Sequence, residues 1–484
     1  MTFCIRSLFH FIPSLRPRLQ GLLPNLNAPI LRAGQILGIL IAGLIGMAGQ
    51  AAAIETYTSH GGPVKGLDLS PDGSLMVSAS FDYSAVLWSI PAYEEKASLI
   101  GHDAALNVAR FSPDGKWLAT GGDDNQVLIW SIAGIMDDPD NYEPVIIKAH
   151  LGKVVGLNFS KDGTMLVSSS WDGTARIWDF SKMPTATSVD DALLMTLDGH
   201  DGPVNASLFS DDGQFLYTAG FDGMVHYWRL RDQMLLHTVV NNGWGVNVMH
   251  VDEGLGLIAY GTTDGGMIIH DMDRDKEVLR MGYDRVPVLS ISARPNKSQL
   301  AFGNAKGMVH IVDLENMSLL RHFRAANGPV WTLLLMKESG DMVLGSLDDH
   351  ITRWKINEFP PHILDKGKID RRFQPTEAMS NGELQFARKC SVCHTLNADG
   401  KRRAGPTLFE VFGRRAGTLE GYPYSNALLN SDIVWDAESI GRLFSDGPDV
   451  VLPGTKMPIQ RMKNRQDRED LISYLEQMTK PGTN

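Results

Sequence analysis

The chain has 484 residues, of which 43% are hydrophobic and 21% charged, a composition typical of soluble globular proteins with room for two or three cores. Its net charge is −11. Residues 1–53 carry four positive charges and the last 110 residues carry 14 basic and 14 acidic side chains, so the middle of the chain carries about −15, a balance that disfavours binding to nucleic acid.

Residues 1–53 have the pattern of an export signal. Their only charged side chains are four arginines, Arg6, Arg16, Arg18 and Arg32. An uncharged apolar run follows at 36–49, and Ala51–Ala53 form a small-residue site suited to cleavage. Because the apolar run is short for a membrane span, a cleaved signal and a periplasmic location are favoured over an uncleaved membrane anchor.

The middle of the chain is a repeat array. Trp88, Trp130, Trp178 and Trp228 each end an apolar run, at spacings of 42, 48 and 50 residues. Further steps of 42 residues reach three more runs of the same kind, which end at His270, Val312 and Trp354. Seven units of this period, built from short β-branched runs and Asp-Gly turns, predict an all-β propeller with seven blades.

These units resemble WD repeats over about residues 54–356. The structural tetrad of that family is a histidine, a serine or threonine, an aspartate and a tryptophan, and the resemblance implies a hydrogen-bonded chain inside each blade. The first four repeats supply complete tetrads: His60, Ser78, Asp82 and Trp88; His102, Thr120, Asp124 and Trp130; His150, Ser168, Asp172 and Trp178; His200, Thr218, Asp222 and Trp228.

Repeats five to seven depart from the tetrad. The changed positions are Tyr260 and His270 in repeat five, Lys306 in repeat six and Leu344 in repeat seven. Since the period and the strand pattern persist, blades are still predicted there. Either sequence drift or specialisation of this arc for a partner would account for the change.

Two further expectations concern the propeller. The segment Ile54–Thr58 is expected to form the outer strand of the last blade and so to close the ring, as the resemblance implies. No nucleophile elbow, phosphate-binding glycine loop or zinc helix is present, but a metal or second-cofactor site remains an alternative. His226 and His310, two residues before the tryptophan position, are expected to pack between blades.

A polar linker is predicted at 358–374, where Pro360 and Pro361 end the strand pattern. Apolar periodicity then changes to that of helices, which are predicted at 377–389 and 467–478. The predicted organisation is therefore an export signal at 1–53, a propeller at 54–357, this linker, and an all-α domain at 375–484.

Residues 390–394 read Cys-Ser-Val-Cys-His, the attachment site of c-type haem. The thiols of Cys390 and Cys393 would bind one haem covalently, and His394 would be the proximal iron ligand. A redox pair or half of a zinc site is the alternative, although no second cysteine pair completes a zinc site. With Cys4 in the export segment, the mature chain has no cysteine left for a disulfide.

From about Pro375 the chain resembles small class I cytochromes c, including the mitochondrial type. Gly382 and Phe386 match the first helix of that family, and Leu471 and Tyr474 match the last. The resemblance implies that these helices pack together and that the glycine permits a close crossing.

The same resemblance implies how the haem is held. The carbonyl of Pro406 would accept a hydrogen bond from His394 and orient its ring. The remaining residues are expected to hold the haem propionates, because buried carboxylates need a cation and hydrogen-bond donors: Arg414, Tyr424 and Trp435.

Residues 453–458 match the methionine loop of the family, which implies Met457 as the second iron ligand. His394 is the only histidine after Pro375, so this domain alone cannot supply two histidine ligands. The competing methionines lie outside such a motif: Met379, Met462 and Met478. Phe444 stands where the mitochondrial type has a tyrosine near the sulfur.

Histidine and methionine ligands together fill both axial positions, which favours outer-sphere electron transfer over haem catalysis. The sequence therefore predicts a periplasmic mono-haem electron carrier whose propeller docks a redox partner: a dehydrogenase, an oxidase or another cytochrome, with peripheral attachment to a membrane complex as an option. One alternative is an oxidoreductase with a substrate site in the propeller and the cytochrome as electron exit. Another is a redox sensor.

Overall fold

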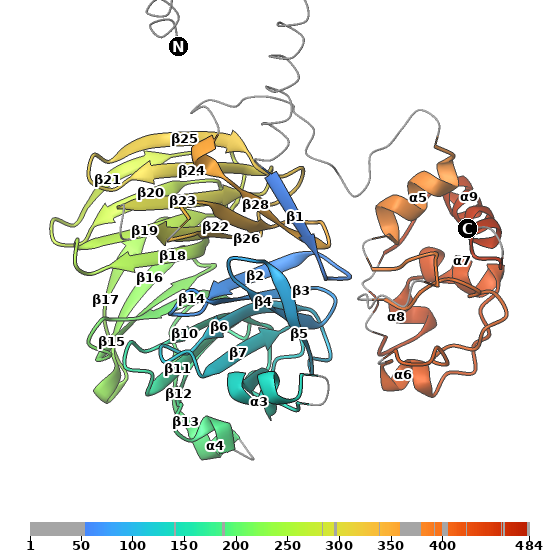
Figure 1. Cartoon of the computed structure of the whole chain (residues 1–484), viewed down its shortest axis with the longest axis horizontal. Coiled ribbons are helices and arrows are strands. Elements are labelled where there is room, and N and C mark those ends of the chain that lie inside the picture. Colours follow the sequence, from blue (N-terminus) through green and yellow to red (C-terminus); the bar gives the residue numbers. More distant parts are fainter. Residues whose placement is uncertain are drawn as a thin grey trace, which may run out of the picture. The chain divides into compact units, whose positions relative to one another are not determined.

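The protein is represented by a computed structural model that describes residues 54–481 (Figure 1). A long gap covers 359–378, and short gaps fall at 140–141, 186–188, 283, 295–297, 338, 392, 399–404, 423, 456 and 458–459. The predicted export segment and all but the first residue of the predicted linker lie outside the described residues. Both therefore stay predictions.

Seven four-stranded sheets follow one another along the chain, as predicted. Blades 1 to 4 consist of β2 (Val64–Leu69), β3 (Leu75–Ser80), β4 (Ser84–Ser89), β5 (Glu94–Ile100); β6 (Leu106–Phe111), β7 (Trp117–Gly122), β8 (Val127–Ser131), β9 (Val145–Ile147); β10 (Val154–Phe159), β11 (Met165–Ser170), β12 (Thr174–Asp179), β13 (Leu193–Asp198); β14 (Val204–Phe209), β15 (Phe215–Gly220), β16 (Met224–Arg229), β17 (Met234–Asn241).

The remaining three blades continue the same order, except that the outer strand of blade 7 comes from the start of the propeller. Blades 5 to 7 consist of β18 (Val246–Asp252), β19 (Leu257–Thr262), β20 (Met267–Asp271), β21 (Lys276–Met281); β22 (Val288–Arg294), β23 (Gln299–Asn304), β24 (Met308–Asp313), β25 (Ser318–Arg324); β26 (Thr332–Leu335), β27 (Met342–Gly345), β28 (His350–Trp354), β1 (Ile54–Thr58).

The ring closes as the sequence predicted. The first strands of successive blades contact one another in order, and β26 of blade 7 meets β2 of blade 1. Strand β1 lies beside β28 in the last sheet (Figure 1). Glu55 links the two strands through ion pairs with Arg353 (3.0 Å) and Lys355 (2.7 Å), so no blade is left one strand short.

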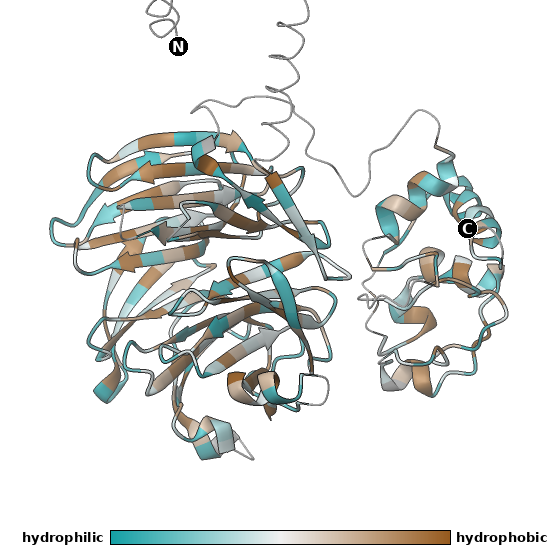
Figure 2. Cartoon of the chain, in the orientation of Figure 1, coloured by the Kyte–Doolittle hydropathy of each residue, from teal (hydrophilic) through white to brown (hydrophobic). Residues whose placement is uncertain are grey.

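Packing between blades supplies the core. The second and third strands of most blades are buried along nearly their whole length because a neighbouring blade covers each face, whereas outer strands such as β5 and β21 are mostly exposed. Figure 2 shows the corresponding alternation of hydrophobic and hydrophilic segments. Short helices lie in the connections: α3 (Ile132–Asp137), η2 (Met183–Thr185), α4 (Val189–Ala192), η3 (Leu230–Asp232) and η5 (Ile356–Glu358).

Each of the first four blades contains the complete hydrogen-bonded tetrad. In blade 1 the indole N–H of Trp88 donates to Ser78 Oγ (2.8 Å), which is bonded to His60 Nε2 (2.6 Å). His60 Nδ1 in turn lies 3.0 Å from the Asp82 carboxylate, to which it donates because an ionised aspartate only accepts. The corresponding distances in blades 2 to 4 are 2.7–2.9 Å, which confirms the predicted chain.

In blades 5 and 6 the polar groups of the corresponding turn are hydrogen-bonded to near neighbours in the sequence. The hydroxyl of Thr262 donates to Asp264 (2.5 Å) and accepts the backbone N–H of Gly266 (2.8 Å). In blade 6 the side-chain oxygen of Asn304 accepts the backbone N–H groups of Lys306 and Met308, both at 3.0 Å. Hydrogen bonds between residues two to four positions apart therefore replace the tetrad bonds, which join residues about twenty positions apart.

The C-terminal region is helical, with elements α5 (Asn381–Lys389), α6 (Asn426–Leu429), α7 (Ala437–Ser445), α8 (Pro448–Val451) and α9 (Arg465–Met478). Side-chain caps set the starts of the two long predicted helices. Ser380 accepts the N–H of Glu383 at α5, and Asn464 accepts that of Gln466 at α9. None of the helices among the described residues has the length and apolar character that crossing a membrane requires.

Helices α5 and α9 cross closely at a glycine. A Cβ atom on Gly382 would lie 2.2 Å from the carbonyl oxygen of Asp470 and 2.6 Å from the Cβ of Tyr474. The ring of Phe386 lies 5.9 Å from that of Tyr474, and Leu471 is fully buried beside them. This is the helix pairing that the resemblance implied.

Candidate haem-binding site

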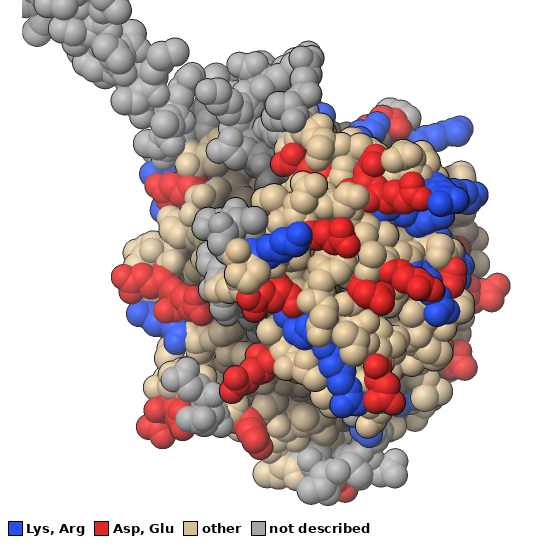
Figure 3. Space-filling model, turned by 90° about the vertical axis from the view of Figure 1, so that its right-hand side faces the viewer, with Lys and Arg blue, Asp and Glu red and all other residues tan. Residues whose placement is uncertain are grey.

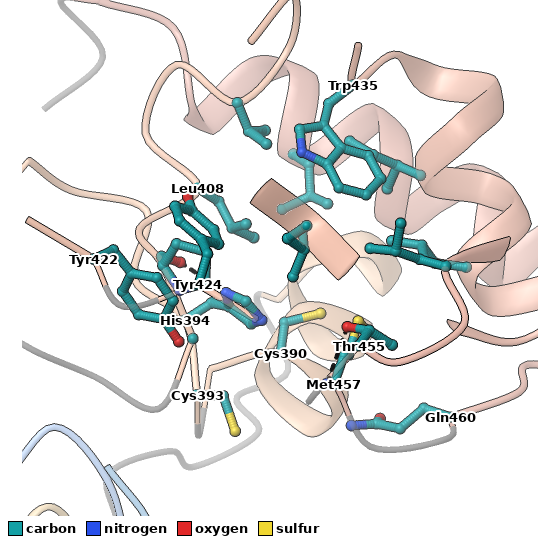
Figure 4. Close-up of a pocket in the computed structure, with 18 of the residues that line it drawn as sticks. Cys390, Cys393, His394, Leu408, Tyr422, Tyr424, Trp435, Thr455, Met457 and Gln460 are labelled. Atoms are coloured by element: carbon teal, nitrogen blue, oxygen red, sulfur yellow. Dashed lines mark hydrogen bonds between the residues drawn. The ribbon is translucent and has the colours of Figure 1, made fainter. Parts of the chain in front are cut away.

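An apolar pocket lies in the C-terminal region, between the end of α5, the segment 405–414, helix α7 and the loop before α9 (Figure 4). Lys389 and Arg414 are the charged residues among its described lining. Aliphatic side chains form a large part of the wall: Leu408, Val411, Ile440, Leu443, Leu452 and Leu475. Phe444 also lines it, fully packed in the core of this region. Such a lining suits a flat hydrophobic ligand.

The cysteine motif follows directly from the end of α5. The N–H of Cys390 donates to Phe386 O (2.8 Å), and Cys393 and His394 both donate backwards to Cys390 O (3.0 and 2.8 Å). This tight turn brings both thiols and the imidazole to the same pocket. Burial raises the pKa of the Cys390 thiol to about 12, so at neutral pH it is protonated.

The imidazole of His394 is held in one orientation. Its Nδ1 donates to the carbonyl oxygen of Pro406 at 2.7 Å, which leaves Nε2 on the side of the pocket (Figure 4). Gly405 packs flat against the ring, since a Cβ atom there would lie 2.3 Å from His394 Cε1. Burial lowers the pKa of His394, which favours the neutral form that binds metals.

Met457 reaches the same pocket from the loop before α9. Its backbone N–H donates to Thr455 Oγ1 (3.2 Å), and its side chain packs against the core of this region. Among the described residues, it is the one methionine that lines the pocket. The competitor Met462 is buried elsewhere, with its N–H bonded to Phe444 O (2.8 Å). Lys456 and Pro458 of the predicted loop lie outside the described residues.

Polar groups gather at one part of the lining. The guanidinium of Arg414 donates to the carbonyl oxygens of Phe409 (3.0 Å) and Thr407 (2.7 Å). Trp435 is tied to the same segment, because its backbone N–H donates to Arg414 O (3.0 Å). Burial lowers the pKa of Arg414 and raises that of the Tyr424 phenol.

Two polar pocket residues next to Tyr424 were missed from the sequence. The ring of Tyr422 lies 4.8 Å from that of Tyr424, and both line the pocket (Figure 4). Ser425 also lines it, and its hydroxyl is buried without a hydrogen-bond partner. Their adjacency to Tyr424 was the available signal. A cation, two phenols, an indole and an unsatisfied hydroxyl fit the carboxylates of haem, and the aliphatic wall fits its ring.

The structure thus brings all the predicted site residues to one pocket, while their roles toward iron and propionates stay predictions. Thr455 and Gln460 complete the lining on the methionine side, and the amide of Gln460 donates to Lys389 O (3.1 Å). Neither was predicted, because their contribution depends on how the loop folds back onto α5.

One histidine group in the propeller bears on the alternative of a metal site. His200, Asp222 and His226 form the single trio of potential ligands found within the described residues. The rings of His200 and His226 lie 4.4 Å apart. Both nitrogens of His200 are already bonded within the tetrad, and His226 Nδ1 is bonded to Thr238 Oγ1 (3.1 Å). The trio is therefore satisfied as a part of the blade.

Comparison with known families divides the chain in the same way. The model of the WD domain, G-beta repeat, matches residues 52–89, 93–131, 143–179 and 191–229, which are the four repeats with complete tetrads. The Cytochrome c model matches residues 379–479.

Curated relatives match the C-terminal region over nearly their whole length. A cytochrome c2 of Blastochloris viridis is 39% identical over 104 residues, which are 22% of this chain and 80% of that protein. A cytochrome c of Gibberella zeae is 36% identical over 107 residues, 21% of this chain and 100% of that protein. A cytochrome c of Theileria annulata is 41% identical over 98 residues, 20% of this chain and 84% of that protein.

Proposed function

Because this chain belongs to the cytochrome c family through its C-terminal region, we propose that it is a periplasmic one-electron carrier with His394 and Met457 as iron ligands and a propeller that docks a redox partner. The chain is an electron-transfer haem protein with covalently attached haem c. Its N-terminal part is a seven-bladed WD-repeat propeller.

The observation that carries the ligand assignment is the meeting of His394 and Met457 at one pocket from distant parts of the chain. The haem, when bound, supplies a one-electron couple at its iron. Around it, Pro406 fixes the imidazole ring and the aliphatic wall excludes water. Arg414 and the free hydroxyl of Ser425 are available to the haem carboxylates. Two protein ligands leave no iron position for a substrate, which favours carriage of electrons over catalysis.

Docking is supported by exposed apolar side chains at one end of the propeller, here called the turn face. They lie in turns before the first strand of a blade or between its second and third strands: Leu151 (88% exposed), Trp171 (51%), Phe221 (59%), Trp244 (59%) and Leu347 (42%). Large apolar side chains gathered on one surface mark interaction sites.

The propeller's own chain ends leave from the opposite end. Glu55 in β1 pairs with Arg353 and Lys355 at the end of β28, whereas Leu347 lies in the turn that begins this strand. The turn face is thus remote from the points where the chain enters and leaves the propeller.

The charge of the chain indicates the chemistry of the partner. The region that contains the propeller carries about −15, so a contact surface with lysine or arginine around an apolar centre would complement it. On the face of the chain drawn in Figure 3, which is not that of the propeller alone, acidic and basic side chains are interspersed. Because salt screens exposed charges over about 10 Å, short-range apolar contact at the turn face would hold a docked partner.

Docking can be tested in the full-length protein. A photo-crosslinking phenylalanine analogue at position 221 would identify the neighbour in cells, and the purified neighbour would then be titrated by calorimetry and stopped-flow kinetics. We expect Trp171→Ser with Phe221→Ser to weaken binding at least tenfold while reduction by small mediators is unchanged. Leu255→Ser, equally exposed (53%) at the opposite end, is the control. Unchanged partner kinetics in the double variant would sink the docking proposal.

The periplasmic location has its own test. N-terminal sequencing of the mature protein from a periplasmic fraction should begin at Ile54, which preserves β1. Recovery of the intact N-terminus from the membrane fraction would instead support an anchor.

A further inference from the structure

Six blades allow a like-for-like comparison of one cross-strand row, which takes one residue from each of the second, third and fourth strands. In blades 1, 2, 3 and 5 the row is wholly apolar and belongs to the core between blades: Val77–Leu87–Ala97, Ala119–Ile129–Val145, Val167–Ile177–Met195 and Ala259–Ile269–Leu279. The blade 6 row, Ala301–Ile311–Arg321, ends in a cation that donates to the carbonyl oxygen of Ile356 (3.0 Å). Only the blade 4 row, Tyr217–Tyr227–His237, carries two phenols, and it ends in an exposed histidine.

The row of blade 4 is ordered by ring contacts. The centroids of Tyr217 and Tyr227 lie 4.7 Å apart, and those of Tyr227 and His237 lie 5.5 Å apart. Tyr217 is 5% exposed, and its hydroxyl donates to Glu253 in the first turn of blade 5 (3.1 Å). Burial raises the pKa of both phenols, so they remain neutral. The aromatic faces are therefore fixed and uncharged.

A cleft opens where this row meets blade 5, with a volume of about 480 Å³. The blade 5 wall contains Gly256, His270, Met272, Asp273 and Asp275. Gly256 has a left-handed φ of 63°, and a Cβ atom there would lie 2.7 Å from the Asp273 carboxylate. Glycine thus allows that carboxylate to fold against the backbone. The volume lies within the usual range of small-molecule sites, about 300–1,000 Å³.

The chemistry of the lining selects for a cation. Among the described lining residues there is no lysine or arginine, while Glu253, Asp273 and Asp275 supply carboxylates. Nε2 of His270 lies 3.2 Å from a carboxylate oxygen of Asp275, so this carboxylate already has one polar neighbour. The negative faces of the tyrosine rings attract positive charge. The carboxylates do not converge with the histidines into a cluster suited to one metal ion, because the described residues contain only the tetrad trio of blade 4.

We propose that this cleft between blades 4 and 5 binds a small organic cation, an alkylated or quaternary ammonium compound, with Tyr217 and Tyr227 against its alkyl groups and Glu253 and Asp273 near its charge. This site is separate from the haem pocket and does not depend on the proposed electron-carrier function. The wholly apolar rows of blades 1, 2, 3 and 5 show how the fold fills the same place without phenols or acidic neighbours.

The test is titration calorimetry of the full-length haem protein with benzyltrimethylammonium, and with benzoate as the probe of opposite charge. We expect saturable binding of the ammonium compound and none of benzoate. Tyr227→Leu installs the residue type of blade 1 and should weaken ammonium binding about tenfold, and Glu253→Gln should do likewise. Glu94→Gln, an exposed carboxylate on β5, is the matched control and should change nothing.

Independent readouts keep the outcome interpretable. A thermal melt checks that each variant folds. Asp273→Asn changes an exposed side chain of the cleft and leaves the packing of the core unaltered. The visible spectrum of the haem should stay the same in all of them. Equal affinity for the ammonium compound and benzoate, or undiminished ammonium binding in Tyr227→Leu and Glu253→Gln, would overturn the proposal.

Discussion

The propeller and the C-terminal region both bury histidines, but they use them in opposite ways. In blade 3, His150 bonds Asp172 through Nδ1 (2.9 Å) and Ser168 through Nε2 (2.7 Å), so that its hydrogen-bonding capacity is used within the blade. His394 bonds Pro406 through Nδ1 and turns Nε2 to the pocket. The blade thus satisfies its buried histidine within the polypeptide, whereas the C-terminal region leaves one histidine nitrogen facing a pocket.

The largest expected effect breaks the C-terminal region alone. His394→Ala should remove the thermal transition of residues 379–481 and most of the ordered haem spectrum, because the pocket loses its proximal ligand. The propeller transition should stay in place. Differential scanning calorimetry with absorbance at each step measures both. If both transitions disappear together, the two regions are not separate folding units.

Loss of the proposed distal ligand should change the iron ligation while the fold is kept. In Met457→Ala the haem should stay covalently bound through Cys390 and Cys393 while the weak near-infrared sulfur-to-iron band vanishes. Met462→Ala is the matched control, since that methionine is buried outside the pocket, and it should keep the band. Survival of the band in Met457→Ala would assign the distal position to another residue.

The reciprocal experiment breaks the propeller. Asp172 accepts bonds from His150, Thr174 and the backbone N–H of Leu151, so Asp172→Ala leaves several donors unpaired, among them the buried ring of His150. We expect a loss of about 3 kcal/mol in the free energy of unfolding of the propeller, with an unchanged haem spectrum. Asp264→Ala should cost about 1 kcal/mol, because the hydrogen bond it removes is the local one from Thr262. Chemical denaturation followed by tryptophan fluorescence distinguishes the two.

Lowering the pH should weaken the same tetrad gradually, without a mutation. Burial alone would raise the pKa of Asp172, but hydrogen bonds from His150 and Thr174 outweigh it and hold the pKa below its usual value. A carboxyl with a depressed folded-state pKa stabilises the fold above its unfolded pKa of about 3.9, and this stability is lost as pH falls through the folded value.

His150 acts in the same direction. Burial lowers its pKa, so protonation below the unfolded value of about 6.5 favours the unfolded chain. The propeller midpoint should therefore fall between about pH 6.5 and pH 3, as measured by thermal melts across that range. Asp172→Asn should flatten the acid part of the curve. A midpoint that rises on acidification would contradict this account.

Much of this molecule can be predicted from its sequence because the signals are local. A period of 42 to 50 residues marks the blades, and Cys390 to His394 are contiguous. The tetrads follow because their members stand at fixed offsets, such as 18 and 22 residues from His150 to Ser168 and Asp172.

Other features depend on register and could not be predicted. The row Tyr217–Tyr227–His237 needs the pairing of three strands, and the sequence shows only scattered aromatic residues. The local bonds of Thr262 and Asn304 depend on turn geometry after the second strand. Helix α5 was expected from 377 but is described from Asn381, because Ser380 serves as its cap.

The pairing of β1 with β28 determines when the propeller can close during synthesis. Glu55 and Arg353 are 298 residues apart, so the first strand of the propeller to be made stays unpaired until the last strand, β28, has been made. Until then the outer edge of blade 7 is open and able to pair with a wrong strand. The ring therefore closes only after the whole propeller has been synthesised, and a chain that ends before β28 cannot complete the fold.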